Sequence, residues 1–294
     1  MIDAHTHCFP PEISKDVQAW AKQYNELHWL QLVAPEGKKS LQGWASIDTT
    51  LKSMDRAGVE KSILLGWYWE HKATCIRQNE LIHAWLEQAP DRFIGFASIH
   101  PKEDPIDQLE LAKAMGFRGV GELHPRLQQY SEHKFEWQAL AEWCSRELWP
   151  INLHVTEGLN HSHDAYIHTP FDDYLELAIR FPDLKIILAH WGGGIPFFEQ
   201  NPKIKAALKN VYYDTAASPL IYSMDIFENM MNLVGAEKLI FGSDFPLCLF
   251  PKMSNEPNVE NFIQAIETLG LSEESRAALL KNTISSVLDL SGNP

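Results

Sequence analysis

The hexapeptide IDAHTH, residues 2–7, ends a short apolar segment with two histidines that are separated by a single residue. In a β-strand, side chains at positions i and i+2 point to the same face, so His5 and His7 would project together from the end of a buried strand. Two imidazoles in that arrangement can bind one cation. Two unrelated polar residues at a strand end would give the same pattern, so the ends of the other strands decide between these interpretations.

Seven further segments have the short, β-branched, apolar character of buried strands. They comprise residues 61–67, 92–100, 117–124, 150–158, 184–191, 210–217 and 238–245. Amphipathic segments typical of helices lie between or after them, at residues 74–90, 105–116, 135–148, 172–183, 224–237 and 258–270. Alternating strands and helices indicate βαβ units and a parallel sheet. Eight strands in 294 residues predict an α/β fold, a distorted (β/α)8 TIM barrel formed as a single domain by residues 1–294.

A doubly wound open sheet is the alternative fold, but no glycine-rich phosphate-binding turn follows the first strand. Two segments fall outside the regular alternation. Residues 25–44 form an insertion between the first strand and its helix. Residues 272–290 predict a terminal helix that packs outside the barrel.

Composition narrows the range of partners. The net charge of −14 argues against a nucleic-acid partner and against an anionic membrane surface, because both draw on clustered Lys and Arg. No apolar run approaches the roughly 20 residues of a membrane span, and the first residues do not resemble a signal peptide. The four cysteines are scattered without a CxxC pair, which is typical of reduced thiols. We therefore expect a cytoplasmic protein that acts on a small molecule and forms, if any oligomer, a homodimer.

Polar residues stand at the carboxyl ends of five of the predicted strands. They are His5, His7, Glu122, His154, His190 and Asp244. Because the carboxyl ends of barrel strands converge on one mouth, these side chains should meet there. Imidazole and carboxylate ligands suit zinc, manganese, iron or nickel. The sequence thus predicts a divalent-metal site, in which His190 is either a ligand or a catalytic base and Glu122 either a ligand or a contact to the substrate.

Four segments resemble signature motifs of the amidohydrolase superfamily: DAHTH (3–7), LHVTEG (153–158), ILAHWGGGIPF (187–197) and IFGSDFP (240–246). The similarity is greatest to the amidohydrolase-related (amidohydrolase 2) branch, which includes aminocarboxymuconate-semialdehyde decarboxylase and aromatic-acid decarboxylases. The resemblance covers residues 2–246 and implies a distorted barrel with a metal at its mouth. It also implies ligation by His5, His7, His154 and Asp244, with His190 beside the metal as an acid/base group.

The segment GVGELHP (119–125) departs from the decarboxylase pattern. It resembles the strand-four Gly-Glu of TatD-like and phosphotriesterase-like members, in which a carboxylate bridges two metals. If Glu122 bridges two ions, His190 becomes a ligand of the second ion. This feature favours a binuclear hydrolase.

The residues accommodate two chemistries. A divalent ion, expected to be Zn²⁺ with Mn²⁺, Fe²⁺ or Ni²⁺ as alternatives, lowers the pKa of its water to about 7. Asp244 can then take the proton, with His190 stabilising the oxyanion, so that an amide, lactone or ester of a small carboxylated metabolite is hydrolysed. The alternative is nonoxidative decarboxylation of an aromatic or enoic acid, in which His190 or Asp244 protonates the carbon that loses CO2. A TatD-like nuclease is less consistent with the acidic charge.

Five further residues are expected to contact the substrate. Arg126 could hold a carboxylate through its guanidinium, although a surface arginine is the commoner case. The others follow strand ends or flank the site: Trp67, His100, His124 and Trp191. The glycines after Trp191 are expected to allow close approach of the backbone at the mouth.

Overall fold

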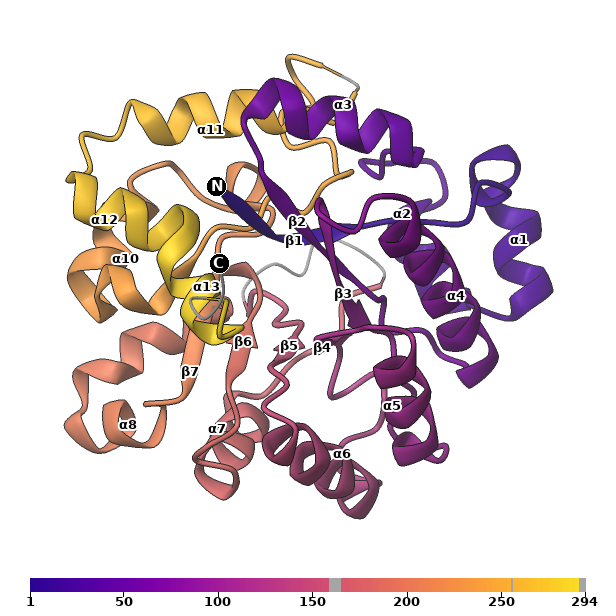
Figure 1. Ribbon diagram of the computed structural model, residues 1–294, viewed down its shortest axis with the longest axis horizontal. Coiled ribbons are helices and arrows are strands. Elements are labelled where there is room, and N and C mark those ends of the chain that lie inside the picture. Colours follow the sequence, from indigo (N-terminus) through magenta and orange to yellow (C-terminus); the bar gives the residue numbers. More distant parts are fainter. Residues whose placement is uncertain (159–164, 255, 291–294) are drawn as a thin grey trace.

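Eight parallel strands form a nearly closed barrel surrounded by helices in the computed structural model, which describes residues 1–158, 165–254 and 256–290 (Figure 1). The strands pair in the order in which they occur along the chain. They are β1 (Ile2–His7), β2 (Lys61–Leu65), β3 (Phe93–Ala97), β4 (Gly119–Leu123), β5 (Ile151–Leu153), β6 (Ile186–Leu188), β7 (Val211–Asp214) and β8 (Leu239–Ile240). The predicted TIM barrel is confirmed, and the open-sheet alternative is wrong.

Backbone hydrogen bonds close the barrel between β1 and the chain that follows β8. The amide of Ala4 donates to the carbonyl of Phe241 over 2.9 Å. Farther along, the amide of Asp244 donates to the carbonyl of His5 over 2.8 Å, and the amide of His7 donates to Phe245. This seam places Asp244 beside the two histidines of β1, although 237 or more residues separate them in the sequence.

Helices on the outside of the barrel lie between consecutive strands, and α11 follows the last strand (Figure 1). They are α3 (Ile47–Ala57), α4 (Lys72–Gln88), α5 (Pro105–Ala114), α6 (Lys134–Arg146), α7 (Phe171–Arg180), α8 (Pro202–Ala207), α9 (Ser218–Ile221), α10 (Ile226–Val234) and α11 (Val259–Glu267). Local sequence sets their ends. The hydroxyl of Ser46 accepts from the amide of Thr49 to begin α3. Gly58 ends that helix with φ of +69°, which favours glycine.

The predicted insertion, residues 25–44, contains one short helix, α2 (Leu27–Val33), and α1 (Val17–Tyr24) precedes it. Indole rings anchor it: Trp29 lies 5.3 Å from Trp20 and 5.4 Å from Trp69, which follows β2. Such aromatic pairs stabilise packing beyond the area they bury. The insertion is therefore fixed against the barrel at the end where β2 finishes.

The C-terminal segment differs from its prediction. It consists of α12 (Glu273–Ala277), a wider turn at Ala278–Asn282, and α13 (Thr283–Val287). Ile284 and Val287 are buried and pack in one cluster with Ile2 and Ile63, near the starts of β1 and β2. The expectation that this segment packs outside the barrel is wrong, because its apolar side chains cover the end of the barrel where the strands begin.

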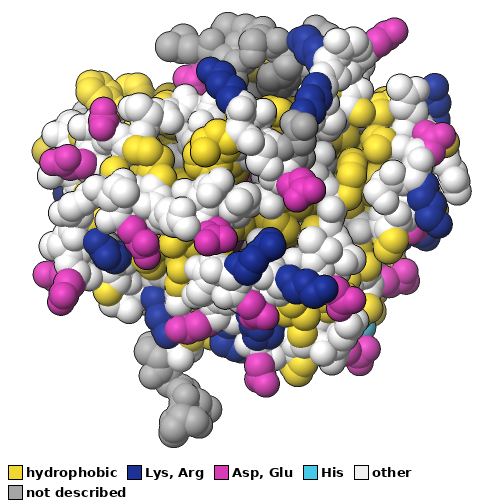
Figure 2. Space-filling view, turned by 90° about the horizontal axis from the view of Figure 1, so that it is seen from above, with side chains coloured by type: hydrophobic (Ala, Val, Ile, Leu, Met, Phe, Trp, Pro, Cys, Tyr) yellow, Lys and Arg dark blue, Asp and Glu magenta, His cyan; other side chains and the backbone are white. Residues whose placement is uncertain are grey.

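Charges of both signs are mixed on the face of the molecule in Figure 2, and no extended patch of Lys and Arg is present on that face. Within the described residues, none of the helices combines the length and apolar character that crossing a membrane would require.

Candidate metal centre

The six predicted strand-end residues come together at the mouth of the barrel. His5, His7 and Asp244 form one group of potential ligands. The Nε2 atoms of the two histidines are 3.2 Å apart. Oδ1 of Asp244 lies 3.5 Å from Nε2 of His7 and 3.8 Å from Nε2 of His5. These three donors surround a space of the size that one cation needs.

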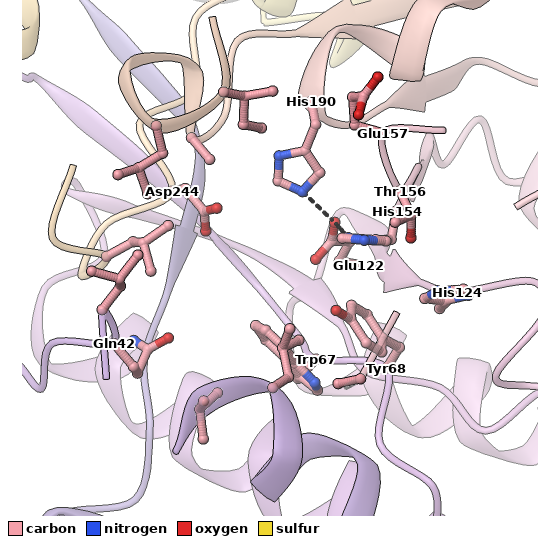
Figure 3. Close-up of a pocket in the computed structure, with 18 of the residues that line it drawn as sticks. Gln42, Trp67, Tyr68, Glu122, His124, His154, Thr156, Glu157, His190 and Asp244 are labelled. Atoms are coloured by element: carbon pink, nitrogen blue, oxygen red, sulfur yellow. Dashed lines mark hydrogen bonds and ion pairs between the residues drawn. The ribbon is translucent and has the colours of Figure 1, made fainter. Parts of the chain in front are cut away.

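Glu122, His154 and His190 form a second group beside the first (Figure 3). Oε1 of Glu122 is 2.8 Å from Nδ1 of His154 and 3.5 Å from Nε2 of His190. Its other oxygen, Oε2, is 3.9 Å from Nε2 of both His5 and His7. Glu122 thus lies between the two groups, where one carboxylate could contact two ions.

Hydrogen bonds at the far side of three imidazoles aim their Nε2 atoms into this centre. Nδ1 of His5 contacts Oδ2 of Asp214 over 2.8 Å. Nδ1 of His7 contacts the carbonyl of Leu65 over 3.3 Å, and Nδ1 of His190 contacts that of Ala216 over 3.1 Å. Because oxygen acceptors hold the proton on Nδ1, each Nε2 presents a lone pair inward. Lone pairs that converge beside buried carboxylates require a shared positive charge, so the donor set fits a divalent metal.

Asp214 is a site residue that the sequence analysis did not single out. It is fully buried at the end of β7. Besides His5, its carboxylate accepts from the side chain of Asn152 and from the backbone amides of His190 and Ala216, each over 3.0 Å. The sequence contains a signal for it, because VYYD (211–214) places a carboxylate in the second half of the predicted strand 210–217, and the observed strand β7 ends at that residue.

The protein groups themselves make this centre attractive to cations. Burial would lower the pKa of His5, but the charge of Asp214 outweighs it and raises that pKa to about 10. Burial, together with the positive charge of His5, lowers the pKa of His7 to about 3. Protonated His5 can therefore donate a hydrogen bond from its Nε2 to Nε2 of neutral His7, 3.2 Å away, and a bound metal ion would take the place of that proton.

The two candidate catalytic groups have pKa values shifted upward. Burial raises the pKa of Asp244 to about 6, although His5 and His190 oppose the change. Burial would lower the pKa of His190, but its hydrogen bond to Glu122 and the charge of that carboxylate raise it. Burial would raise the pKa of Glu122, but His154 and His190 hold it well below its usual range.

The backbone after β6 makes an unusual turn at the centre. His190 and Trp191 have φ values of +55° and +58°, and Gly192 and Gly193 continue in the same left-handed region. A Cβ atom at Gly192 would lie 2.8 Å from the ring of Tyr213, and one at Gly193 would lie 2.7 Å from Val155. The expected close approach of the backbone is therefore present. Left-handed conformations at residues other than glycine are strained and concentrate at functional sites.

A cavity of about 470 Å³ opens onto this centre, with Glu122, His154, His190 and Asp244 in its wall. Two of the five predicted substrate contacts, Trp67 and His124, also line it. Tyr68, which follows Trp67 at the exit of β2, lines it as well. Burial and then the charges of Glu122 and Asp244 raise the pKa of Tyr68 well above its usual range, so its hydroxyl stays protonated.

The other three predicted contacts are not among the residues that line the described cavity, and each has another partner. Arg126 forms an ion pair with Asp173, with Nε 2.7 Å from Oδ2. His100 is 3.0 Å from the carbonyl of Glu70. The indole of Trp191 donates to the hydroxyl of Ser218. The structure therefore places the polar groups of Arg126, His100 and Trp191 against a side chain or backbone carbonyl of the protein, outside the lining of the described cavity.

The sequence profile of the amidohydrolase family matches residues 2–290 of the chain. The chain belongs to this family. Three solved structures are similar to it in fold. The 2,6-dihydroxybenzoate decarboxylase from Rhizobium is 18% identical, with a TM-score of 0.67 and 99% of each chain covered. The 5-carboxyvanillate decarboxylase from Sphingomonas paucimobilis is 14% identical, with a TM-score of 0.73 and 98% of each chain covered.

The third is a dihydroxybenzoic acid decarboxylase from Polaromonas with bound manganese and an inhibitor, 2-nitroresorcinol. It is 20% identical, with a TM-score of 0.67, and the match covers 99% of this chain and 97% of that one. At identities this low, the similarity shows the shared fold alone. The family match over residues 2–290 and the buried donor set at the mouth of the barrel make this amidohydrolase-family chain a metal-dependent enzyme.

Proposed function

We propose that this enzyme is a nonoxidative decarboxylase of an aromatic or enoic carboxylic acid. The observation that carries the proposal is the placement of Asp244 and His190 beside buried imidazoles at one end of a cavity whose other walls are largely apolar. The named activities of the three similar structures agree with it.

Protein side chains would hold the ion and orient the acid. His5, His7, His154 and Asp244 are the ligands we propose, and a divalent ion there supplies a Lewis acid for the carboxylate of the substrate and a neighbouring oxygen. Apolar side chains such as Leu32 and Leu220 border the same cavity. These side chains exclude water from the bound acid. In such surroundings the transition state, whose charge is dispersed, is favoured over the carboxylate, whose charge is localised.

The reaction also needs a proton donor. When the bond between the carboxyl group and its carbon breaks, CO2 leaves and the electron pair stays on that carbon, which must accept a proton. Burial raises the pKa of Asp244 to about 6 in the protein without metal, but as a ligand of the ion Asp244 would be held as a carboxylate and could not donate. His190, whose pKa is also raised, is therefore the donor that we propose.

Hydrolysis of an amide, lactone or ester is the second candidate function, and Glu122 favours it. Its two oxygens face different groups of ligands, at 2.8 Å from His154 and 3.9 Å from His5. A carboxylate in that position would allow two ions to be bound, with His190 as a ligand of the second. The ion would be manganese, as in the Polaromonas structure, or the zinc that hydrolases commonly use.

Metal counting combined with product analysis separates the two functions. The purified chain is loaded with Mn²⁺ or Zn²⁺, dialysed, and its bound metal is measured per chain by mass spectrometry. It is then incubated with a panel of hydroxybenzoates and enoic diacids, and in parallel with lactones and esters. We expect metal-dependent release of CO2 from at least one acid. Two ions per chain, cleavage of a lactone or ester, and no CO2 from any acid would contradict the decarboxylase and favour the hydrolase.

A further inference from the structure

The cavity is much larger than the carboxylate and single ring that would lie at the metal centre. Its volume of about 470 Å³ compares with the roughly 150 Å³ that suffice to hold one benzene ring. The residues of the metal centre form only part of its wall. A single-ring acid bound at the centre would therefore leave most of the cavity empty.

In the remainder of the wall, aliphatic side chains form two groups beside the polar side chains of His28, Lys38, Lys39, Gln42, Thr156 and Glu157. Leu32 and Val33 at the end of α2, and Leu41 farther along the insertion, provide one group of apolar side chains. Leu220 and Ile221 of α9 provide another, which Leu247 extends after β8. Apolar surface that a ligand removes from water contributes about 25 cal/mol per Å² to binding.

Hydrogen bonds fix the insertion that carries the first group. The amide of His28 donates to the carboxylate of Glu70 over 2.7 Å, and Nε2 of the same histidine is 3.0 Å from the carbonyl of Ala165. Trp29, one residue farther along α2, is fully buried among other indoles. The wall is thus formed before any ligand binds, and little ordering of the chain opposes binding.

From this geometry we infer that the substrate is an acid with an apolar extension larger than one ring, which binds between Leu32 of the insertion and Leu220 of α9. This inference rests on the proposed function, because it places the carboxylate at the metal centre. The apolar wall and the cation-attracting floor belong to one continuous cavity. An amphipathic acid is the class of molecule that satisfies both.

Equilibrium binding tests the inference without requiring turnover. The probes are linear carboxylates from butanoate to decanoate, titrated by calorimetry into the Mn²⁺-loaded protein. Each added methylene that enters an apolar site strengthens binding by about three- to fourfold. We expect the dissociation constant to fall by that factor per carbon up to at least octanoate. Equal affinity for short and long acids would overturn the inference and leave the proposed function intact.

Two variants locate the extension. Leu32→Trp fills the cavity from α2 and should remove the gain in affinity with chain length. Leu27→Trp is the matched control, because Leu27 is on the same helix, is 46% exposed and does not line the described cavity. It should keep the full gain.

Leu220→Trp repeats the test from α9, in case Leu32→Trp does not fold. If affinity still increases with the length of the carboxylate in a folded Leu32→Trp or Leu220→Trp protein, the inference is overturned. A chain-length gain without CO2 release from any acid would support the apolar site and count against the decarboxylase.

Discussion

Asp214 orients the imidazole of His5 and should control metal affinity without touching the ion. Asp214→Asn keeps the shape of the side chain but removes the negative charge that faces Nδ1 of His5 at 2.8 Å. Loss of such an outer partner typically weakens metal binding by about 10- to 100-fold. We expect that loss for Mn²⁺, measured by competition with a fluorescent chelator. Asp225→Asn, on the outside of the barrel before α10, is the control, and equal affinity in the two variants would contradict the role.

Tyr68 is positioned to donate a hydrogen bond to the substrate. Its side chain is 1% exposed, its hydroxyl points toward Glu122 in Figure 3, and no described residue accepts a hydrogen bond from it. Tyr68→Phe should therefore lower kcat/KM for the best acid of the panel by about 10- to 100-fold, with unchanged metal content. Tyr130→Phe removes a hydroxyl from a buried tyrosine outside the cavity and should leave kcat/KM unchanged. A Tyr68→Phe enzyme with full activity would exclude this contact.

Whether a residue could be predicted from the sequence depended on where its partner lies. His5, His154 and Asp244 were found because strand ends converge in any barrel, whatever the loops do. The ion pair of Arg126 could not be predicted, because Asp173, which lies 2.7 Å from it, is 47 residues away in another connection. The partner of a polar side chain is set by the tertiary structure, and the spacing of residues in the sequence does not predict it.

At the scale of the elements, Glu26 links the insertion to the segment after β2 and should make stability depend on pH. Oε2 of its buried carboxylate accepts from the amide of Glu70 over 2.7 Å. Burial raises the pKa of Glu26 from 4.5 to about 7. Between these pH values the folded state holds a proton that the unfolded state has lost, so the stability contributed by this group falls as pH rises and stays reduced above pH 7.

Glu26→Gln removes that titration. Relative to wild type, we expect the variant to gain stability on going from pH 4.5 to pH 8, by up to about 3 kcal/mol, measured by urea unfolding at each pH. Because the other titrating groups are the same in both proteins, their contributions to the pH dependence of stability cancel in the difference. Glu36→Gln, in an exposed position of the same insertion, should show no such gain. A constant difference between Glu26→Gln and wild type across this pH range would rule out the ionisation of Glu26 as the cause.

Strands and helices could be predicted where their sequence signals lie within the element itself. All eight strands and the main outer helices follow from apolar periodicity and from end signals such as Ser46 and Gly58. The position of α13 did not follow, because Ile284 and Val287 read equally well as the apolar face of an outer helix. Only the open end of the barrel, bordered by Ile2 and Ile63, determines which surface they cover.

At the scale of the whole molecule, the metal centre spans the seam that closes the barrel. His5 and His7 belong to the first strand, Asp244 follows the last strand, and backbone hydrogen bonds join the two segments. An ion held by all three would connect the first and last strands of the sheet. Because it binds the folded state and not the unfolded one, it should stabilise the entire barrel.

We therefore expect the thermal unfolding midpoint to rise when Mn²⁺ or Zn²⁺ is added to metal-depleted protein. At 100 times the dissociation constant, the stabilisation is about 2.7 kcal/mol, which corresponds to roughly 4–5 °C for a chain of this size. Excess chelator should reverse the shift, and Asp244→Asn should reduce it strongly while Asp225→Asn leaves it intact. An unchanged midpoint in wild type at saturating metal would mean that the first and last strands do not share an ion, and the assignment of His5, His7 and Asp244 as one ligand group would then be wrong.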